Sequence, residues 1–363
     1  MPEVHVDQFV PVLLPNDAVG NHTLETQRAL VEAGVDSSIW AISVHHRLAG
    51  RGRPYGEFDR ASRAQNGQRL LVYQAASVSG GIVDYLLTRP EPKSISYHNL
   101  TPPEFYEPFA PSVAGGLREA QAELRRLLPH VKVATAASEF NAADLRARGV
   151  PDVRVIPPFI GFGPRCEPDF EHLQRLRAAK TGLALLFVGR LVPNKTHQHL
   201  IRLVAALRAA CDPGAVLYLV GPDGPDQYVH SLRTMAERLV PGGVVFTGPV
   251  SDGELQAHYE AADAFVCMSE HEGFGVPLVE AMRARLPIVA YDRGAVAETL
   301  GGSGILLRTP EPRWAAEVVA RMGQDEILRD QIIRRQLARA KELEQFPRDR
   351  MIVEAALAVC QVG

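Results

Sequence analysis

The sequence predicts an α/β protein built from two doubly wound domains of the Rossmann type. Short apolar runs alternate with amphipathic segments through most of the 363 residues. Strands that alternate with helices favour parallel sheets joined by right-handed crossovers. A chain of this length also fits about two domains of roughly 150 residues each.

In the first half of the chain, the period of the apolar residues separates strands from helices. The predicted strands are Phe9–Leu14, Ser38–Ile42, Arg69–Tyr73, Ser94–Tyr97, Val131–Ala136 and Val153–Ile156. The predicted helices are Leu24–Ala33, Gly81–Leu87, Leu117–Leu128 and Ala142–Arg148. This half is therefore expected to form one parallel sheet covered by helices.

A segment dense in proline and glycine, residues 157–164, interrupts the alternation and marks a linker. The alternation then restarts. The predicted strands are Leu183–Gly189, Val216–Gly221, Val244–Thr247, Ala264–Met268, Pro287–Tyr291 and Gly304–Leu307. The predicted helices are Thr196–Ala210, Gln227–Leu239, Asp252–Ala262, Pro277–Ala284, Arg313–Arg321, Asp325–Leu343 and Arg348–Val359.

The predicted domains are residues 1–160 and 161–345, with a hinge near Pro158 and a ligand cleft between them. The last segment, 346–363, is expected to be a helix that packs back toward the first domain.

Bulk composition excludes several classes of protein. The net charge of −3 gives no support for nucleic-acid binding. The four cysteines are far apart in sequence, without a CxxC pair, which is typical of reduced thiols in a cytoplasmic protein. We expect no signal peptide and no membrane span, because the start lacks a basic region followed by an apolar run and no apolar run reaches about 20 residues.

The most informative segment is Ser269–Met282, which follows the predicted buried strand Ala264–Met268. It places Glu272 and Glu280 around a glycine-flanked turn and a helix start. A helix N-terminus offers free N–H groups to an anion, and carboxylates accept hydrogen bonds from hydroxyls. The combination indicates a sugar nucleotide. In the alternative interpretation, Glu272 is a solvated loop acid and Glu280 a helix acid favoured by the dipole.

A second charged pair follows the first strand of the second domain. The predicted strand Leu183–Gly189 delivers Arg190 to its carboxyl end, where open α/β sheets bind ligands. Lys195 follows near the next helix start. Two cations placed in this way would hold a diphosphate, Arg190 through a bidentate fork and Lys195 as a point charge. A solvated basic turn is the alternative.

These segments resemble the family-four retaining glycosyltransferases of GT-B fold, the group 1 glycosyltransferases. The resemblance is carried by Gly189–Lys195 and by Glu272–Met282, which matches the family's signature of two glutamates separated by seven residues. Further segments similar to the family are Tyr218–Gly221, Thr247–Ser251 and Pro287–Glu298. The resemblance covers nearly all of the second domain and is looser in the first.

The resemblance implies a division of roles. The first domain would bind the acceptor and the second a nucleoside-diphosphate sugar, linked to UDP or GDP. Glu272 would face the sugar hydroxyls, and Glu280 would accept hydrogen bonds from the ribose hydroxyls. Arg190 and Lys195 would neutralise the leaving diphosphate. The implied donor-binding residues are Gly20, Asn21, Gly189, Gly221, Gly273, Phe274, Gly275, Val276 and Glu280.

No metal site and no cofactor beyond the co-substrate are expected, because the chain has no Asp-x-Asp triplet of the kind that holds a divalent ion on a diphosphate.

In the first domain, the loop after the first strand and the end of the fourth strand are the candidate regions. Gly20 and Asn21 resemble part of the family's glycine-containing loop, where many members have paired glycines and this chain has Val19-Gly20. The alternative is a plain helix start capped by Asn21 or Thr23. His98 is expected to face the cleft, to bond a sugar hydroxyl or assist proton transfer. Gln74 ends the preceding strand and is expected nearby.

Two smaller expectations concern the helices of the first domain. Ser138 is expected to cap the last helix of that domain. The mixed-charge helix 117–128 would rest on an anionic membrane if the acceptor is lipid-linked, and is otherwise solvated. A peripheral position at the inner face of the membrane therefore stays open.

The leading hypothesis is a retaining, metal-independent transfer of a hexosyl unit to an acceptor hydroxyl on a glycan, a lipid-linked sugar or a small molecule. A nucleotide-sugar epimerase of GT-B architecture would need further acid and base residues. A dehydrogenase would need G-x-G-x-x-G after the first strand, which the sequence lacks. A catalytically silent nucleotide-sugar-binding protein is the remaining alternative. The nucleotide base, sugar, acceptor and oligomeric state are not predicted.

Overall fold

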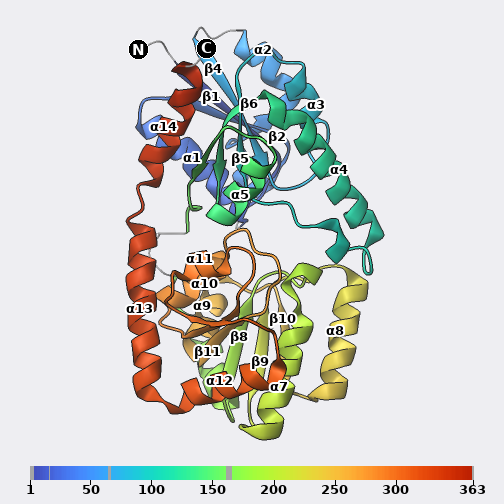
Figure 1. The fold of residues 1–363 in the computed structure, drawn as a ribbon, viewed down its shortest axis with the longest axis vertical. Helices are drawn as coiled ribbons and strands as arrows, with labels where there is room; N and C mark the ends of the chain where they lie inside the picture. Colours follow the sequence, from blue (N-terminus) through green and yellow to red (C-terminus); the bar gives the residue numbers. More distant parts are fainter. Residues whose placement is uncertain (1–3, 16, 64–66, 161–165, 362–363) are drawn as a thin grey trace. The chain divides into compact units, whose positions relative to one another are not determined.

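The computed structural model describes residues 4–15, 17–63, 67–160 and 166–361, which form two compact units (Figure 1). The first unit comprises Met1–Glu104, Ser112–Phe159 and Phe346–Gly363, and the second comprises Phe105–Pro111 and Ile160–Gln345. The division differs from the expected ranges 1–160, 161–345 and 346–363 mainly at Phe105–Pro111. The last four residues of the expected linker, 161–164, lie outside the described residues.

The first unit is a seven-stranded parallel sheet with the order β3-β2-β1-β4-β5-β6-β7. Its strands are β1 Val4–Leu13, β2 Asp36–Val44, β3 Arg53–Pro54, β4 Gln68–Ala75, β5 Lys93–Tyr97, β6 Val131–Ala136 and β7 Asp152–Val155. Its helices are α1 Ala18–Glu32, α2 Phe58–Ser62, α3 Ile82–Leu87, α4 Pro111–Leu127, α5 Glu139–Ala147 and α14 Arg348–Gln361. The short elements β3 and α2 were not predicted, because two and five residues carry no periodic pattern.

The second unit is a six-stranded parallel sheet with the order β10-β9-β8-β11-β12-β13. Its strands are β8 Ala184–Val188, β9 Val216–Val220, β10 Val244–Gly248, β11 Ala264–Cys267, β12 Ile288–Tyr291 and β13 Ile305–Leu307. Its helices are α6 Phe170–Ala179, α7 His197–Ala210, α8 Asp226–Leu239, α9 Asp252–Ala261, α10 Val276–Arg283, α11 Val296–Leu300, α12 Pro312–Gln324 and α13 Glu326–Glu344. Helices α6 and α11 were missed from the sequence.

Each sheet reverses its direction of winding at one place. In the first unit β1 lies between β2 and β4, and in the second β8 lies between β9 and β11. Ligands of open α/β sheets bind beyond the carboxyl ends of the strands at such a switch point. The strand orders therefore confirm the predicted doubly wound fold and select the loops after β1, β4, β8 and β11 as candidate binding loops.

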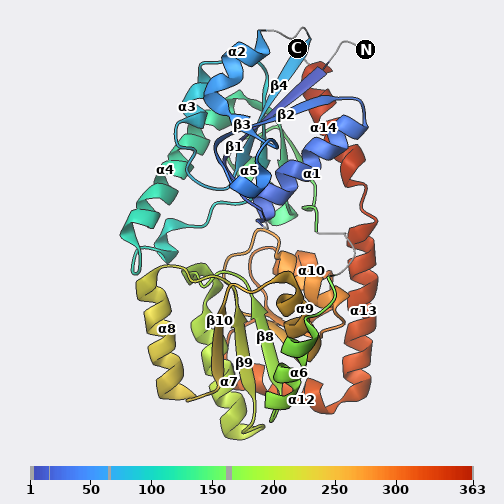
Figure 2. The ribbon, with the colours of Figure 1, turned by 180° about the vertical axis from the view of Figure 1, so that it is seen from behind.

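The C-terminal helix α14 packs beside α1 in the first unit (Figures 1 and 2). The apolar cluster beneath it joins α14 to α1, β1, β4 and β6, and includes Val6, Leu30, Leu70, Val133, Ile352, Ala355 and Val359. The buried Arg348, at the start of α14, donates from Nε to the carbonyls of Pro157 and Pro158 at 3.0 and 3.1 Å. The helix thus completes the core of the first unit although it is the last element of the chain.

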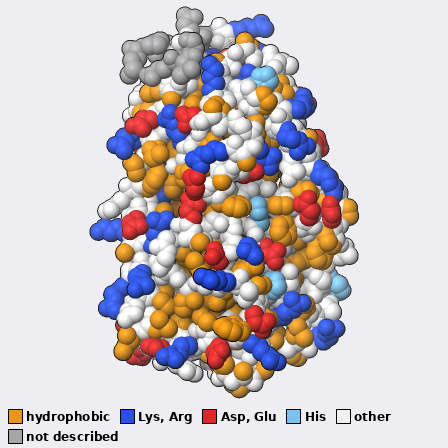
Figure 3. Space-filling model, viewed as in Figure 1, with side chains coloured by type: hydrophobic (Ala, Val, Ile, Leu, Met, Phe, Trp, Pro, Cys, Tyr) orange, Lys and Arg blue, Asp and Glu red, His pale blue; other side chains and the backbone are white. Residues whose placement is uncertain are grey.

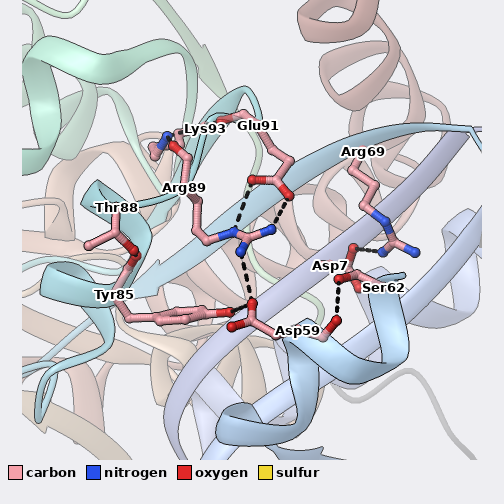
Figure 4. A network of polar contacts seen from close by, with 9 residues as sticks. All are labelled: Asp7, Asp59, Ser62, Arg69, Tyr85, Thr88, Arg89, Glu91 and Lys93. Carbon is pink, nitrogen blue, oxygen red and sulfur yellow. Dashed lines mark hydrogen bonds and ion pairs between the residues drawn. The ribbon is translucent and has the colours of Figure 1, made fainter. Parts of the chain in front are cut away.

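Charged and polar side chains in the first unit form a network of hydrogen bonds and ion pairs (Figure 4). Asp59 on α2 accepts hydrogen bonds from Tyr85 at 2.6 Å and Arg89 at 2.8 Å, and Arg89 also binds Glu91. In the buried pair Asp7–Arg69, burial raises the pKa of Asp7 against the opposing effects of Trp40 and Arg69. These charges connect strands and helices, and we assign them a structural role.

The surface carries charges of both signs. Lysines and arginines are interspersed with aspartates and glutamates over the face shown in Figure 3, in agreement with the small net charge of −3. Among the described residues, no helix is both long and apolar enough to cross a bilayer.

The expected cap of α5 gives a first prediction. Ser138 is 1% exposed, and its hydroxyl accepts from the backbone N–H of Asn141 at 3.2 Å, which confirms it as the N-cap. We predict that Ser138→Ala lowers the free energy of unfolding by about 1 kcal/mol. The exposed Ser77 provides the matched control, and Ser77→Ala should change little. Urea denaturation measures both, and equal effects of the two substitutions would contradict the capping role.

Candidate functional site

The charged centre of the second unit is an ion pair between Lys195 and Glu272. The loop after β8 carries Lys195 and the loop after β11 carries Glu272, so the two residues flank the switch point of this sheet. Lys195 Nζ donates to Glu272 Oε1 at 2.5 Å. The side chains are only 19% and 11% exposed. The structure therefore joins two residues that are 77 positions apart in sequence.

Polar contacts around the ion pair fasten its two loops together. Asn194 Nδ2 donates to the carbonyl of His271 at 3.1 Å, and the Glu270 N–H donates to the carbonyl of Asn194 at 3.0 Å. The hydroxyl of Thr196 donates to the carbonyl of Met268. The residues on either side of Lys195 thus hold the backbone on which Glu272 sits. The cation and the carboxylate are preorganised by the fold.

A turn after β12 supports Glu272 from another direction. The N–H of Ala295 donates to the carbonyl of Glu272 at 3.0 Å. Gly294 has φ of 58°, and a Cβ atom at this position would lie 2.7 Å from the carbonyl oxygen of Glu272. Only glycine permits both this conformation and this close approach.

The local electrostatics keep Lys195 positively charged. Burial alone would lower the pKa of Lys195, but the charge and hydrogen bond of Glu272 outweigh it and raise that pKa. Burial raises the pKa of Tyr106, and the charges of Arg190 and Lys195 oppose that rise. Both cations therefore act in the same region of the second unit as the segment Phe105–Pro111. Arg190 is exposed.

The turn before α10 has the geometry expected of an anion-binding helix start. Gly275 caps the helix with φ of 89°, and helix α10 begins at Val276. The carbonyl of Phe274 accepts from the Thr299 hydroxyl at 2.6 Å, which anchors the turn. Gly273 lies in the same turn, directly after Glu272. The first N–H groups of a helix lack intrahelical partners and favour negative charge.

Glu280 lies on α10 and is held by a residue that the sequence did not reveal. Its Oε2 accepts a hydrogen bond from the Tyr259 hydroxyl at 2.8 Å. Burial raises the pKa of Glu280, although Tyr259 and Arg283 oppose the rise. No local pattern marks Tyr259 as a partner, because it lies on α9, 21 positions earlier.

Gly189 and Gly221 follow neighbouring strands β8 and β9 and let their ends approach closely. Their φ angles are 149° and 141°. A Cβ atom on Gly221 would lie 2.3 Å from the carbonyl oxygen of Gly189. The structure thus gives Gly221 a packing reason and Gly189 a conformational one, its positive φ, and contact with a donor stays a prediction.

In the first unit, Gly20 and Asn21 lie inside the first turn of α1. The helix begins at Ala18 rather than at the expected Leu24. Its cap is Asp17, which accepts from the N–H groups of Val19 and Gly20 at 3.2 and 3.0 Å. The alternative caps Asn21 and Thr23 were therefore wrong, because both residues lie inside the helix that Asp17 caps.

The glycine at position 20 has a packing reason of its own. A Cβ atom there would lie 2.2 Å from the carbonyl oxygen of Leu14. Asn21 is exposed, so its side chain is available to a ligand, and its role as a donor contact stays a prediction.

His98 follows β5 and is part of a buried polar network. Its Nε2 lies 2.7 Å from Oε1 of Gln74, which is fully buried. The His22 ring lies edge-on to it at 5.0 Å. Burial, assisted by the charge of His22, lowers the pKa of His98 well below its ordinary value. His98 is therefore neutral near pH 7.

The structure thus brings the predicted residues together in two groups. Lys195, Glu272 and the turn 273–276 gather in the second unit, and His98 lies with Gln74 and His22 in the first. Reasoning from sequence missed Asn194, Thr196, Tyr259 and Gly294 as supporting residues. Asn194 and Gly294 lay within the motif segments and could have been found there. Among the described residues, no group of three or more His, Cys, Asp or Glu side chains could hold a metal ion.

A preorganised cation–carboxylate pair and a helix start at the switch point of a doubly wound sheet mark this part of the second unit as its candidate ligand-binding site. Comparison with known families makes this assignment specific. Residues 169–339 match the model of glycosyl transferases group 1. This segment, nearly all of the second unit, is therefore a group 1 glycosyltransferase domain.

Characterised relatives agree with the family. The chain is 33% identical over 205 residues to D-inositol 3-phosphate glycosyltransferase of Actinosynnema mirum, covering 53% of this chain and 47% of the relative. It is 30% identical over 194 residues to the GDP-mannose-dependent alpha-(1-6)-phosphatidylinositol monomannoside mannosyltransferase of Mycobacterium tuberculosis, covering 50% and 49%. The match thus spans about half the length of these relatives.

Solved structures confirm the GT-B fold. Anabaena HepE in complex with UDP and glucose has a TM-score of 0.72 at 19% identity, covering 99% of this chain and 100% of its own. WaaG, a glycosyltransferase involved in lipopolysaccharide biosynthesis, has a TM-score of 0.67 at 16% identity, covering 98% and 99%. At these identities the likeness establishes the fold alone.

The close packing at Gly294 can be tested against a matched glycine. Gly302 also has positive φ, 78°, but nothing lies within 4 Å of a Cβ atom there. We predict that Gly302→Ala costs only the backbone strain of about 1–2 kcal/mol. Gly294→Ala should cost clearly more, because its methyl group displaces Glu272. Chemical denaturation measures both, and equal losses would contradict the steric role of Gly294.

Acid should destabilise the protein through its buried histidines. Burial lowers the pKa of His22 to about 4, and burial with the charge of Lys195 lowers that of His197 to about 3. A depressed histidine pKa means that the unfolded chain binds the proton first, so stability is lost as pH falls below about 6.5. The slope is about 1.4 kcal/mol per pH unit for each such histidine until its folded pKa is reached.

We predict that His197→Phe reduces this slope in denaturation measured between pH 4.5 and 6.5, a range chosen from these pKa values. The exposed His230 serves as the control, and His230→Gln should leave the slope as it is. An unchanged slope in His197→Phe would contradict the assignment.

Proposed function

We propose that the protein is a retaining glycosyltransferase that moves a hexosyl unit from a nucleoside-diphosphate sugar to an acceptor hydroxyl, without a metal ion. The observation that carries this proposal is the Lys195–Glu272 pair, held beside the start of α10 at the switch point of a group 1 glycosyltransferase domain. The cation and the helix N-terminus suit the diphosphate, whose negative charge grows as it leaves, and the carboxylate suits the sugar hydroxyls.

The cations would act on the leaving group. As the glycosidic bond breaks, negative charge grows on the diphosphate, and preorganised positive charge there lowers the barrier. Lys195 is mostly buried and keeps its proton, so its charge is only weakly screened. The exposed Arg190 would add a second cation from the end of β8. These two residues, with the amides from Gly273 to Val276, would bind the diphosphate.

The two acids would bind hydroxyls rather than act as a hydrolytic pair. Glu272 has one oxygen on Lys195, and its other oxygen is left to accept from the transferred sugar. Glu280 has Oε2 on Tyr259 and would offer Oε1 to the ribose. Each acid is thus fixed by a partner that orients its second oxygen.

His98 would contact the reacting sugar or the acceptor hydroxyl from the first unit, as a catalytic residue. Asn21 and Gly20 would lie near the diphosphate or acceptor. The donor base is proposed to be uracil or guanine, because HepE binds UDP and the mycobacterial mannosyltransferase depends on GDP-mannose. The acceptor would be a glycan, a lipid-linked sugar or a small molecule, in the cytoplasm or at the inner face of its membrane.

The first experiment is a screen of UDP- and GDP-linked hexoses for binding and for slow donor hydrolysis. Release of nucleoside diphosphate separates an enzyme from a silent binding protein, and formation of an isomeric nucleotide sugar would indicate an epimerase. No release with any donor that binds would contradict the transferase proposal.

A matched pair of lysine variants tests the diphosphate site. We predict that Lys195→Met weakens nucleoside-diphosphate binding by about 10-fold or more, since a charge-assisted contact contributes about 1.5–3 kcal/mol. Lys180 also pairs with a carboxylate, Asp263 at 2.6 Å, and lies before β8 rather than after it. Lys180→Met should bind normally. Calorimetry on both variants measures this, and equal affinities would overturn the role of Lys195.

A further inference from the structure

A line of amide side chains in the first unit connects a helix backbone to His98. Nε2 of Gln8, on β1, lies 3.2 Å from the carbonyl oxygen of Thr23, on α1. Nε2 of Gln74, on β4, lies 2.8 Å from Oε1 of Gln8. Oε1 of Gln74 lies 2.7 Å from Nε2 of His98. Both glutamines are 0% exposed.

The direction of every hydrogen bond in this line follows from its first member. The backbone carbonyl of Thr23 can only accept, so Gln8 must present its NH₂ group to it. The side-chain oxygen of Gln8 then faces Gln74, so Gln74 must donate to it from its own NH₂ group. The oxygen of Gln74 therefore faces His98 and accepts a hydrogen bond. Reversing any one amide would set two acceptors or two donors against each other in a buried place, which costs about 1–3 kcal/mol.

The last hydrogen bond of this line determines which ring nitrogen of His98 carries the proton. Because Gln74 offers His98 an acceptor, Nε2 must carry hydrogen. Ser96 Oγ lies 3.4 Å from the same nitrogen, but a hydroxyl can donate or accept and so sets no direction. The neutral ring has one proton only, and its Nδ1 atom is then a bare acceptor. Nδ1 makes no hydrogen bond within the part of the chain that the structure describes.

We propose that Gln8 and Gln74 are positioning residues that hold His98 as the Nε2–H tautomer, so that Nδ1 accepts a hydrogen bond from a hydroxyl of the sugar donor or the acceptor. The catalytic use of Nδ1 rests on the proposed glycosyl transfer. The tautomer itself does not, because it follows from the hydrogen-bond line alone. An unprotonated Nδ1 can accept a hydrogen bond from a hydroxyl, but a phosphate or carbonyl oxygen has no proton to donate to it. The hydrogen-bond line therefore also determines which ligand group can bind at Nδ1.

The direct test is long-range ¹H–¹⁵N NMR of the imidazole in the full-length wild-type protein, which distinguishes a protonated from an unprotonated ring nitrogen. Loss of one signal set in His98→Asn assigns His98 among the 12 histidines. We expect Nε2 to be protonated and Nδ1 unprotonated at pH 7. Protonation at Nδ1 would overturn the proposal, and this measurement needs neither a variant of the line nor any activity.

The variant that isolates the line is Gln8→Leu, which does not touch His98. It frees the Gln74 amide to turn over, so His98 should become a mixture of both tautomers. Gln27 provides the control, because its Nε2 also donates to a backbone carbonyl, that of Ser37 at 3.0 Å, outside the line. Gln27→Leu should leave the tautomer unchanged. If Gln8→Leu does not fold, Gln74→Leu gives the same readout. A pure Nε2–H tautomer in the folded variant would contradict the line.

Activity measurements separate this inference from the proposed function. With a donor found in the screen, Gln8→Leu should lower kcat by roughly 10- to 100-fold, by analogy with the loss seen when the partner that orients a metal-binding histidine is removed. Its donor KM should change little. A shifted tautomer with unchanged kcat would contradict the proposal that Nδ1 takes part in catalysis. Absence of transfer by the wild type would refute the proposed function and leave the tautomer result standing.

Discussion

The geometry of the second unit depends on one interaction, the ion pair between Lys195 and Glu272. Removing one partner of a buried ion pair leaves the other charge unpaired and lowers the free energy of unfolding by about 3–5 kcal/mol. The fold therefore surrounds this pair with supports. Asn194 and Thr196 fasten its two loops together, and Gly294 admits the backbone of Glu272 where any side chain would collide. The pair is thereby held in the arrangement that we propose for binding a diphosphate and a sugar.

The first unit applies the same principle to a neutral group. Instead of a charge, it fixes a proton: the hydrogen-bond line from Thr23 to His98 gives the imidazole a defined donor side. In both units the candidate catalytic side chain comes from a loop after a strand, and its partner comes from a neighbouring strand or loop. Parallel sheets make this arrangement natural, because their carboxyl ends collect loops that are distant in sequence.

Sequence predicted the two sheets, most of the helices and the central residues of the second unit. Strand periodicity is strong in buried parallel sheets, and Arg190, Lys195 and Glu272 stand in the loops that follow such strands. The supports were harder to see. Tyr259 pairs with Glu280 only through tertiary packing, and the direction of the line through Gln8 depends on a backbone carbonyl of another element. The cap Asp17 was not predicted, because the helix was expected to begin at Leu24 and it begins at Ala18.

The most direct test of the account is a crystal structure of the protein with a nucleoside-diphosphate hexose bound. The account predicts diphosphate oxygens within ion-pair distance of Lys195, sugar hydroxyls on Glu272 and the ribose on Glu280. A nucleotide bound elsewhere, with the Lys195–Glu272 pair untouched by the diphosphate or the sugar, would contradict it.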